Sequence, residues 1–194
     1  GAPTKTRNVS AIALIESRGN ASHLIDCGEA TQHQILHTRL SRNTLSTIFI
    51  THLHADHCYG LPGLLASAGL NGRTKLLRIF APEGAKEWIE FTQNISELYL
   101  PYPLEFKTPN DVSACDFNQV TVSSITLSHS ISSFGYAFTE SNIPQTLNVG
   151  KLTAKGTPQG PLWGKIQAGN NVEVDGVSYK STDFCSTRVP TSPV

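Results

Sequence analysis

Short apolar segments and longer amphipathic segments alternate along the first two thirds of the chain. Runs with period-two alternation are typical of β-strands, and segments with apolar residues at helical spacing are typical of α-helices. The predicted strands are 9–16, 23–27, 46–50, 76–80, 104–107, 120–127 and 134–139. The predicted helices are 29–40, a short helix opening at 60–65, and 83–98. Strands that alternate with helices favour a layered α/β domain.

The pattern changes after residue 140, where closely spaced Gly and Pro residues interrupt any strand or helix periodicity up to about residue 180. The dipeptide Asp175-Gly176 is typical of a tight hairpin, here between 172–174 and 177–179. We therefore predict a core domain at 1–140, an arm or insertion at 141–184, and a return towards the core at 185–194.

Composition limits the partners and the compartment. The 15 basic and 15 acidic residues cancel, so any nucleic-acid binding must use a local patch. The four cysteines are widely spaced, which argues against a zinc ribbon or a dense disulfide framework and suits a reducing compartment. No apolar run approaches the ~20 residues that span a bilayer, and the N-terminus does not resemble a signal peptide. We expect a cytoplasmic protein that does not enter a membrane.

The strongest chemical signal is segment 51–58, Thr-His-Leu-His-Ala-Asp-His-Cys, directly after a predicted strand. Because alternate strand residues share a face, His52 and His54 can point the same way as the strand ends. The turn that follows brings Asp56 and His57 to a neighbouring position. Imidazole and carboxylate groups suit zinc and similar ions. One metal can bind His52 and His54, and a second can bind Asp56 and His57. Single histidines in loops often have no ligand role, but this spacing favours a metal site.

Two residues elsewhere are candidates for the same site. His129 follows the predicted strand 120–127 and can supply a third imidazole; a single histidine in this position is otherwise a structural residue. Asp26 ends a predicted strand and can hydrogen-bond a ligand histidine as a supporting residue, or it can serve as a turn or helix-capping aspartate.

Three other residues of the kinds that bind metals are interpreted as structural: His33, His37 and Cys58. His33 and His37 have the i, i+4 spacing of a helical metal pair, but no further ligand lies nearby in the sequence, so packed or solvent-facing side chains are favoured. Cys58 adjoins the histidine motif and is interpreted as a buried thiol.

The histidine motif carries a family resemblance. Residues 51–57 resemble the signature of the metallo-β-lactamase superfamily, and the extension Gly-Leu-Pro-Gly-Leu-Leu at 60–65 resembles the ribonuclease Z branch, the tRNA 3′-processing endoribonucleases. Segment 26–32 is similar to the family motif D-C-G-E-G-T-Q, with Ala30 in place of the usual Gly. Further similar stretches follow in the family's order at 3–8 and 129–136, so the resemblance covers nearly the whole chain.

This resemblance implies the first half of a metallo-β-lactamase αββα sandwich. It also implies two zinc ions that activate a water to remove 3′ trailers from tRNA precursors. The implied ligands are His52, His54 and His129 for one ion, with Asp56 and His57 for part of the second. Asp56 is in addition the candidate that orients or deprotonates the attacking water.

Residues 146–176 resemble the protruding arm that binds the tRNA elbow in this family. The implied substrate contacts are Lys151, Lys155, Gly160, Pro161 and Lys165. In the family, the arm of one subunit serves the active site of another, so we expect a homodimer that binds precursor tRNA. Because the arm and the metal motif lie in one chain, the short form is the better match, as in bacterial ribonuclease BN.

The family also uses a metal-bridging Asp after the arm and a late His, and the chain ends at Val194 before either. Asp183 matches the closing segment of the arm and is not assigned as that ligand. We therefore expect an internal piece of a longer enzyme, truncated at both ends, that holds at most one metal tightly and cleaves poorly alone. Two alternatives stay open: another hydrolase of this fold acting on small phosphodiesters or esters, and a non-catalytic metal- or RNA-binding fragment.

Overall fold

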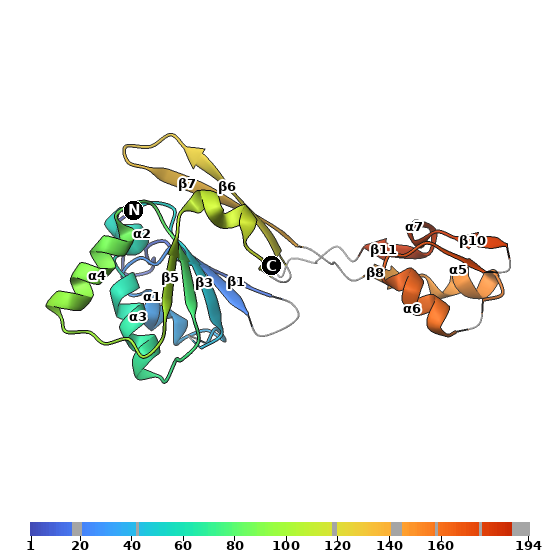
Figure 1. The fold of residues 1–194 in the computed structure, drawn as a ribbon, viewed down its shortest axis with the longest axis horizontal. Coiled ribbons are helices and arrows are strands. Elements are labelled where there is room, and N and C mark those ends of the chain that lie inside the picture. Colours follow the sequence, from blue (N-terminus) through green and yellow to red (C-terminus); the bar gives the residue numbers. More distant parts are fainter. Residues whose placement is uncertain are drawn as a thin grey trace. The chain divides into compact units, whose positions relative to one another are not determined.

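A computed structural model describes residues 1–16, 21–41, 43–117, 120–140, 145–157, 159–174 and 176–187 (Figure 1). The chain divides into two compact units, Gly1–Thr139 and Glu140–Val194, which we call unit 1 and unit 2. Within the described ranges, we find no helix with the length and apolar character needed to cross a membrane.

Unit 1 is built on a five-stranded mixed sheet. Its strands pair in sequence order: β1 (Ile12–Ile15), β2 (Ser22–Ile25), β3 (Leu45–Phe49), β4 (Leu77–Phe80) and β5 (Leu104–Lys107). β1 is antiparallel to β2, and the pairs from β2 to β5 are parallel. Parallel strands need crossover connections, which the helices supply. The α/β architecture predicted from the alternating pattern is confirmed.

Helices cover one face of this sheet (Figure 1). They are α1 (Thr31–Ile35), α2 (Ala55–Cys58), α3 (Leu61–Leu70) and α4 (Ala85–Ile95). Alternate strand residues such as Ile48 and Ile79 point to this face and share a buried cluster with Leu64 of α3 and Ile89 of α4. The four side chains are at most 1% exposed, so each contributes on the order of 1.5–3 kcal/mol of burial free energy.

The opposite face of the sheet is aromatic and packs against a second, two-stranded sheet. That sheet pairs β6 (Val120–Leu127) with β7 (Ser133–Glu140), and the 3-10 helix η1 (Pro109–Ala114) precedes it. Phe49 and Phe80 stack with ring centroids 5.3 Å apart, and Phe138 of β7 meets Phe49 edge-on. Helices, sheet and second sheet form three successive layers of a sandwich.

The first helix is shorter than predicted. Helical composition extends over 29–40, but α1 begins only at Thr31, because Ala30 adopts a left-handed conformation with φ 62°. At the other end the Thr38 hydroxyl donates to the carbonyl of Ile35 and accepts from the N–H of Leu40. Such local side-chain bonds compete with helix formation.

Unit 2 has a small core of its own. Its elements are β8 (Gln145–Leu147), α5 (Val149–Ala154), α6 (Pro161–Gln167), β9 (Val172–Val174), β10 (Val177–Tyr179), α7 (Ser181–Phe184) and β11 (Cys185–Thr187). The core side chains are Leu152, Trp163, Ile166, Tyr179 and Phe184. The predicted hairpin is confirmed by the pairing of β9 with β10, although Asp175 lies outside the described residues. β11 pairs with β8, and the rest of the predicted return segment lies outside the described residues.

Candidate metal centre

Three imidazoles meet where β3 ends. His52 and His54 follow β3, and His129 lies in the segment between β6 and β7. One ligand nitrogen from each ring lies within 4.8 Å of the others. The Nδ1 atom of His54 and the Nε2 atom of His129 are 3.4 Å apart. The structure thus brings together the three residues predicted to share one metal.

The aromatic layer explains why His129 reaches the other two rings. Tyr136 of β7 packs on Phe49 with ring centroids 5.0 Å apart, and its hydroxyl donates to the carbonyl of Ile50 at 3.2 Å. The N–H of Phe134 donates to the carbonyl of Thr51 at 2.9 Å. These contacts hold the start of β7 beside the end of β3, and the segment before β7 carries His129.

Asp56 and His57 lie next to this cluster on the one-turn helix α2. The rings of His52 and His57 are 4.0 Å apart between centroids. The Nε2 atom of His57 is 3.5 Å from the Oδ2 atom of Asp56, which also contacts the amino group of Gly1. The two residues predicted for a second metal therefore face one another beside the first three.

Asp26 supports the site through the hydrogen bonds of its buried carboxylate. It is 3% exposed and has φ 60°, a left-handed conformation that Asp tolerates better than most residues. Its carboxylate accepts hydrogen bonds from the Ser10 hydroxyl, from the N–H and hydroxyl of Thr51, and from Nδ1 of His57 at 2.6 Å. Charge-assisted bonds of this kind offset the cost of burying a carboxylate.

Two glycines let the segment after β2 approach the histidine motif. The N–H of Cys27 donates to the carbonyl of His57 at 2.7 Å, and the N–H of Gly60 donates to the carbonyl of Cys27 at 2.9 Å. A Cβ at Gly60 would overlap the carbonyl of Gly28, and one at Gly28 would overlap the side chain of Val9. Glycine is required here for close backbone contact.

The electrostatics keep His52 neutral. Burial, with smaller contributions from His57 and His54, lowers the pKa of His52 to about 4. A neutral imidazole has a free lone pair at pH 7, as a metal ligand requires. Burial also raises the pKa of the Cys58 thiol to about 11, and this thiol donates to the carbonyl of His54. The prediction that Cys58 is a buried structural thiol is confirmed.

One pair of ligand nitrogens has the separation expected in a tetrahedral metal site, and all three lie within 4.8 Å of one another. Two nitrogens bound to zinc at about 2.0–2.1 Å lie about 3.3 Å from each other in a tetrahedron. The 3.4 Å separation between His54 and His129 matches this edge. The donor set, nitrogen with neighbouring carboxylate, suits a borderline divalent ion. The histidine cluster therefore supports metal binding.

Other residues of the kinds that bind metals lie apart from this cluster. His33 and His37 are exposed on and just after α1, in agreement with the structural interpretation. Asp183 lies on α7 within unit 2.

The predicted substrate residues all lie in unit 2. Lys151 is exposed on α5, and its ammonium donates to the carbonyl of Asp183 at 3.2 Å. Lys165 is exposed on α6, which begins with Gly160 as its N-cap and Pro161 as its first residue. The ammonium of Lys155 lies 5.6 Å from the Phe184 ring centroid and so also stabilises the unit 2 core.

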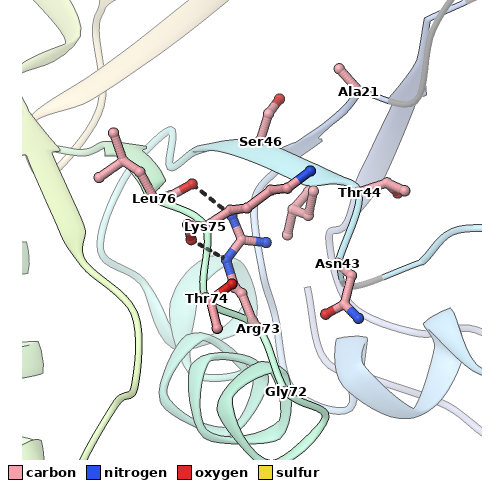
Figure 2. Close-up of a pocket in the computed structure, with 10 residues that line it drawn as sticks. Ala21, Asn43, Thr44, Ser46, Gly72, Arg73, Thr74, Lys75 and Leu76 are labelled. Carbon is pink, nitrogen blue, oxygen red and sulfur yellow. Dashed lines mark hydrogen bonds between the residues drawn. The ribbon is translucent and has the colours of Figure 1, made fainter.

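Several surface depressions lie away from the histidine cluster. One of ≈ 520 Å³ lies at the amino ends of β3 and β4, lined among others by Asn43, Arg73 and Lys75 (Figure 2). The guanidinium of Arg73 donates to the carbonyls of Lys75 and Leu76 and so holds the turn before β4. In a parallel sheet, the amino ends of the strands lie at one edge and the carboxyl ends at the other. This depression is therefore separate from the histidine cluster, which follows the carboxyl end of β3.

Comparison with solved structures defines the class. A metallo-β-lactamase fold protein from Bacillus subtilis superposes with a TM-score of 0.55 at 19% identity, over 72% of this chain and 55% of that one. The fold is thus that of the metallo-β-lactamases, as expected from the motif. The model of the family described as anti-Pycsar protein Apyc1 matches residues 1–143, and the chain belongs to this family.

Full-length similarity points to one branch. A ribonuclease Z of Pseudomonas putida (strain W619) is 44% identical over 190 residues, 98% of this chain but 59% of that protein. The crystal structure of short-form human tRNase Z superposes with a TM-score of 0.62 at 32% identity, over 72% of this chain and 60% of that one. The resemblance to ribonuclease Z is confirmed, and the chain spans about 60% of the length of such relatives.

One supporting residue was not predicted as functional. Thr51 belongs to the recognised motif, but no role for its side chain follows from spacing alone, because its partner Asp26 is distant in sequence. The one signal in the sequence is a hydroxyl residue directly before the first histidine of the motif.

Proposed function

We propose that the protein is a metal-dependent endoribonuclease that removes 3′ trailers from tRNA precursors. One combined observation carries this proposal: the three-histidine cluster of unit 1 occurs in a chain that aligns over 98% of its length, unit 2 included, with a protein named ribonuclease Z. The histidine cluster supports the hydrolytic chemistry, and the alignment of unit 2 supports the choice of substrate.

We propose zinc as the metal. His52, His54 and His129 would hold one ion, and Asp56 with His57 would contribute to a second. Bound zinc supplies Lewis acidity and lowers the pKa of a water ligand towards neutrality. Cys58 is not assigned as a ligand, because its thiol is buried and donates a hydrogen bond to the carbonyl of His54.

The chain's own groups have distinct tasks in this proposal. The Asp56 carboxylate is partly exposed beside the histidines, where it can orient a water or accept its proton. Asp26 holds the His57 ring through Nδ1, which directs Nε2 towards Asp56. Attack of water on the phosphodiester would form a new P–O bond and break the bond from phosphorus to the 3′-oxygen. The proton lost by the water would pass to Asp56 or to solvent, and the departing 3′-oxygen would take up a proton from solvent.

Substrate selection is assigned to unit 2. Phosphate contacts position a folded RNA without reading its sequence, and lysines suit that task. Lys151 and Lys165 are exposed and Gly160-Pro161 begins α6, whereas Lys155 also packs on Phe184. The homodimer and the cytoplasmic location stay predictions.

One observation favours a second candidate function. The matching family model ends at residue 143, so it covers unit 1 and little of unit 2. A hydrolase of small phosphodiesters would need the metal cluster without the RNA-binding unit. A comparison of an RNA substrate with a small phosphodiester distinguishes the two functions.

The test compares a precursor tRNA that carries a 3′ trailer with bis(p-nitrophenyl) phosphate, in the presence of zinc. We expect slow cleavage at the trailer junction only, and the rate of this cleavage should fall by about 100-fold or more in His54→Ala. The double change Lys151→Ala and Lys165→Ala should weaken precursor binding about tenfold, since each lost phosphate contact removes favourable charge. Lys86→Ala, an exposed lysine on α4, is the matched control and should bind normally.

Each other outcome selects an alternative. Turnover of the small ester with no binding of precursor tRNA would favour the small-phosphodiester hydrolase. Binding of precursor tRNA without cleavage at any zinc concentration would favour the non-catalytic fragment.

A further inference from the structure

The hydroxyl of Thr51 lies between two groups of the candidate metal centre. Its Oγ1 atom is 2.8 Å from Oδ1 of Asp26 and 2.9 Å from Nδ1 of His52. Thr51 directly precedes His52 and is half-buried. The Thr51 side chain therefore links the buried carboxylate of Asp26 to the ring of His52. Among the hydrogen bonds of the described residues, none joins Asp26 directly to His52.

Counting protons determines what this connection does. A hydroxyl has one hydrogen, and an ionised carboxylate only accepts. The Thr51 hydrogen therefore goes to Asp26, and the hydroxyl can then only accept from His52. A neutral imidazole has one N–H, so Nδ1 of His52 must carry it. Nε2 is left with the lone pair.

We infer that Thr51 is a positioning residue that fixes the tautomer and orientation of His52 for metal binding through Nε2. Asp26 would then set two rings at once: His57 directly at 2.6 Å, and His52 through the Thr51 hydroxyl. Partners of this kind raise metal affinity because a ring already held in its binding tautomer loses less freedom when the ion binds. The inference rests on the proposed metal centre for its functional meaning, but the tautomer can be measured without metal.

The site lets the hydroxyl be removed with little other change. The backbone of Thr51 keeps two bonds of its own: its N–H donates to Asp26 Oδ1, and its carbonyl accepts from Phe134. Asp26 also keeps its bonds from Ser10 and His57. Thr51→Val has nearly the same shape without the hydroxyl, and Thr51→Ser keeps the hydroxyl without the methyl group.

The experiment first measures the histidine tautomers of the metal-free chain by long-range ¹H–¹⁵N NMR, with the His52 signals assigned from a His52→Gln variant. We expect the Nδ1–H form in the wild type and in Thr51→Ser, and a mixture of both tautomers in Thr51→Val. Zinc affinity is then measured by chelator competition. Thr51→Val should bind zinc about 10- to 100-fold more weakly, and Thr51→Ser should stay near the wild-type affinity.

The outcomes that overturn the inference differ from those that overturn the proposed function. An Nε2–H tautomer at His52 in the wild type contradicts the inference even if Thr51→Val does not fold. Equal zinc affinity in Thr51→Val and wild type, or equal losses in Thr51→Ser and Thr51→Val, contradicts it as well. If the wild type binds no zinc, the metal centre is wrong, while the tautomer spectra still decide the role of Thr51.

Discussion

At the residue scale, Ala30 occupies a position that favours glycine. Its φ of 62° is left-handed, and an alanine there costs about 1–2 kcal/mol because Cβ crowds the following carbonyl. The residue directly precedes α1 and follows the glycine-dependent approach at Gly28. The usual Gly of the similar family motif therefore has a backbone explanation here.

We predict that Ala30→Gly stabilises the protein. Relief of the left-handed strain exceeds the extra chain entropy of glycine, for a net gain of about 0.5–1 kcal/mol in the free energy of unfolding. Urea denaturation measures this gain. Ala66→Gly in the middle of α3, where the backbone is helical, is the control in the same unit and should lose about 0.5–1 kcal/mol. A loss of stability in Ala30→Gly would contradict the assigned conformation.

His23 should make stability depend on pH. It is buried, its Nε2 atom is 3.2 Å from the Glu16 carboxylate, and Arg78 and Asp116 line the same cavity. Burial lowers the pKa of His23, and Glu16 opposes that shift only in part. Because the folded-state pKa lies below the unfolded value, the unfolded chain binds more protons as pH falls below about 6.5. Stability is therefore present above that pH and is lost below it.

The measurement is urea denaturation of wild type and His23→Gln at pH 8 and pH 5.5. Glutamine keeps polar atoms near Glu16 but does not titrate, so the wild type should lose more stability on acidification than the variant. Carboxylates and other histidines titrate in both proteins and cancel in the comparison. Equal losses would show that His23 does not contribute.

At the residue scale, the sequence predicted which side chains lie together where the spacing of a motif is diagnostic. The motif spacing and the strand before His129 predicted three rings that the structure brings within 4.8 Å. Prediction failed where a role depends on a contact between distant residues. The left-handed φ of Asp26 and its bond to Thr51 arise from tertiary packing, which no local pattern encodes.

At the element scale, the segment after β2 and the turn after α2 contact each other through backbone atoms. We predict that Gly60→Ala destabilises unit 1 by about 3 kcal/mol, because the new Cβ would overlap the Gly28 carbonyl and neither backbone can shift without losing its hydrogen bonds. Zinc affinity should fall with it, since Cys27 bonds to His57 in the same contact.

Thermal unfolding and zinc titration measure both effects. Gly164→Ala on α6 is the control, because a Cβ there meets open space and helical alanine is favoured by about 0.5–1 kcal/mol. A Gly60→Ala protein as stable as the wild type would mean that the two segments do not touch as described.

Helices and strands with a clear hydrophobic period in the sequence were predicted better than those without one. β5 and β6 lie at the predicted residues, because a strand with period-two alternation has a clear beginning and end. α5 and α6 were not predicted, since Gly150 and Gly164 lower helix propensity inside these short segments, and the helices are stabilised by the unit 2 core instead. One-turn helix α2 is too short to show a period at all.

At the scale of the whole molecule, each unit has its own core, so the candidate metal centre of unit 1 and the proposed tRNA contacts of unit 2 can be disturbed separately. Ile166 is 0% exposed in unit 2, and Ile166→Ala should cost about 2–5 kcal/mol there. We predict weaker precursor tRNA binding with unchanged zinc affinity, and hydrogen exchange that increases over 145–187 but not in unit 1. Ile95→Ala removes the same atoms from a side chain that is 70% exposed and should change neither property. Loss of zinc binding in Ile166→Ala would contradict the separation.

The central claim is that His52 and His54 of the histidine motif bind one metal ion together with His129, which lies 75 residues beyond His54 in the chain. X-ray absorption at the zinc edge of the zinc-loaded protein tests it most directly. We predict three imidazole nitrogens at about 2.0 Å from zinc, with one fewer in His129→Ala. A spectrum without imidazole scattering, or one that His129→Ala leaves unchanged, would contradict the claim.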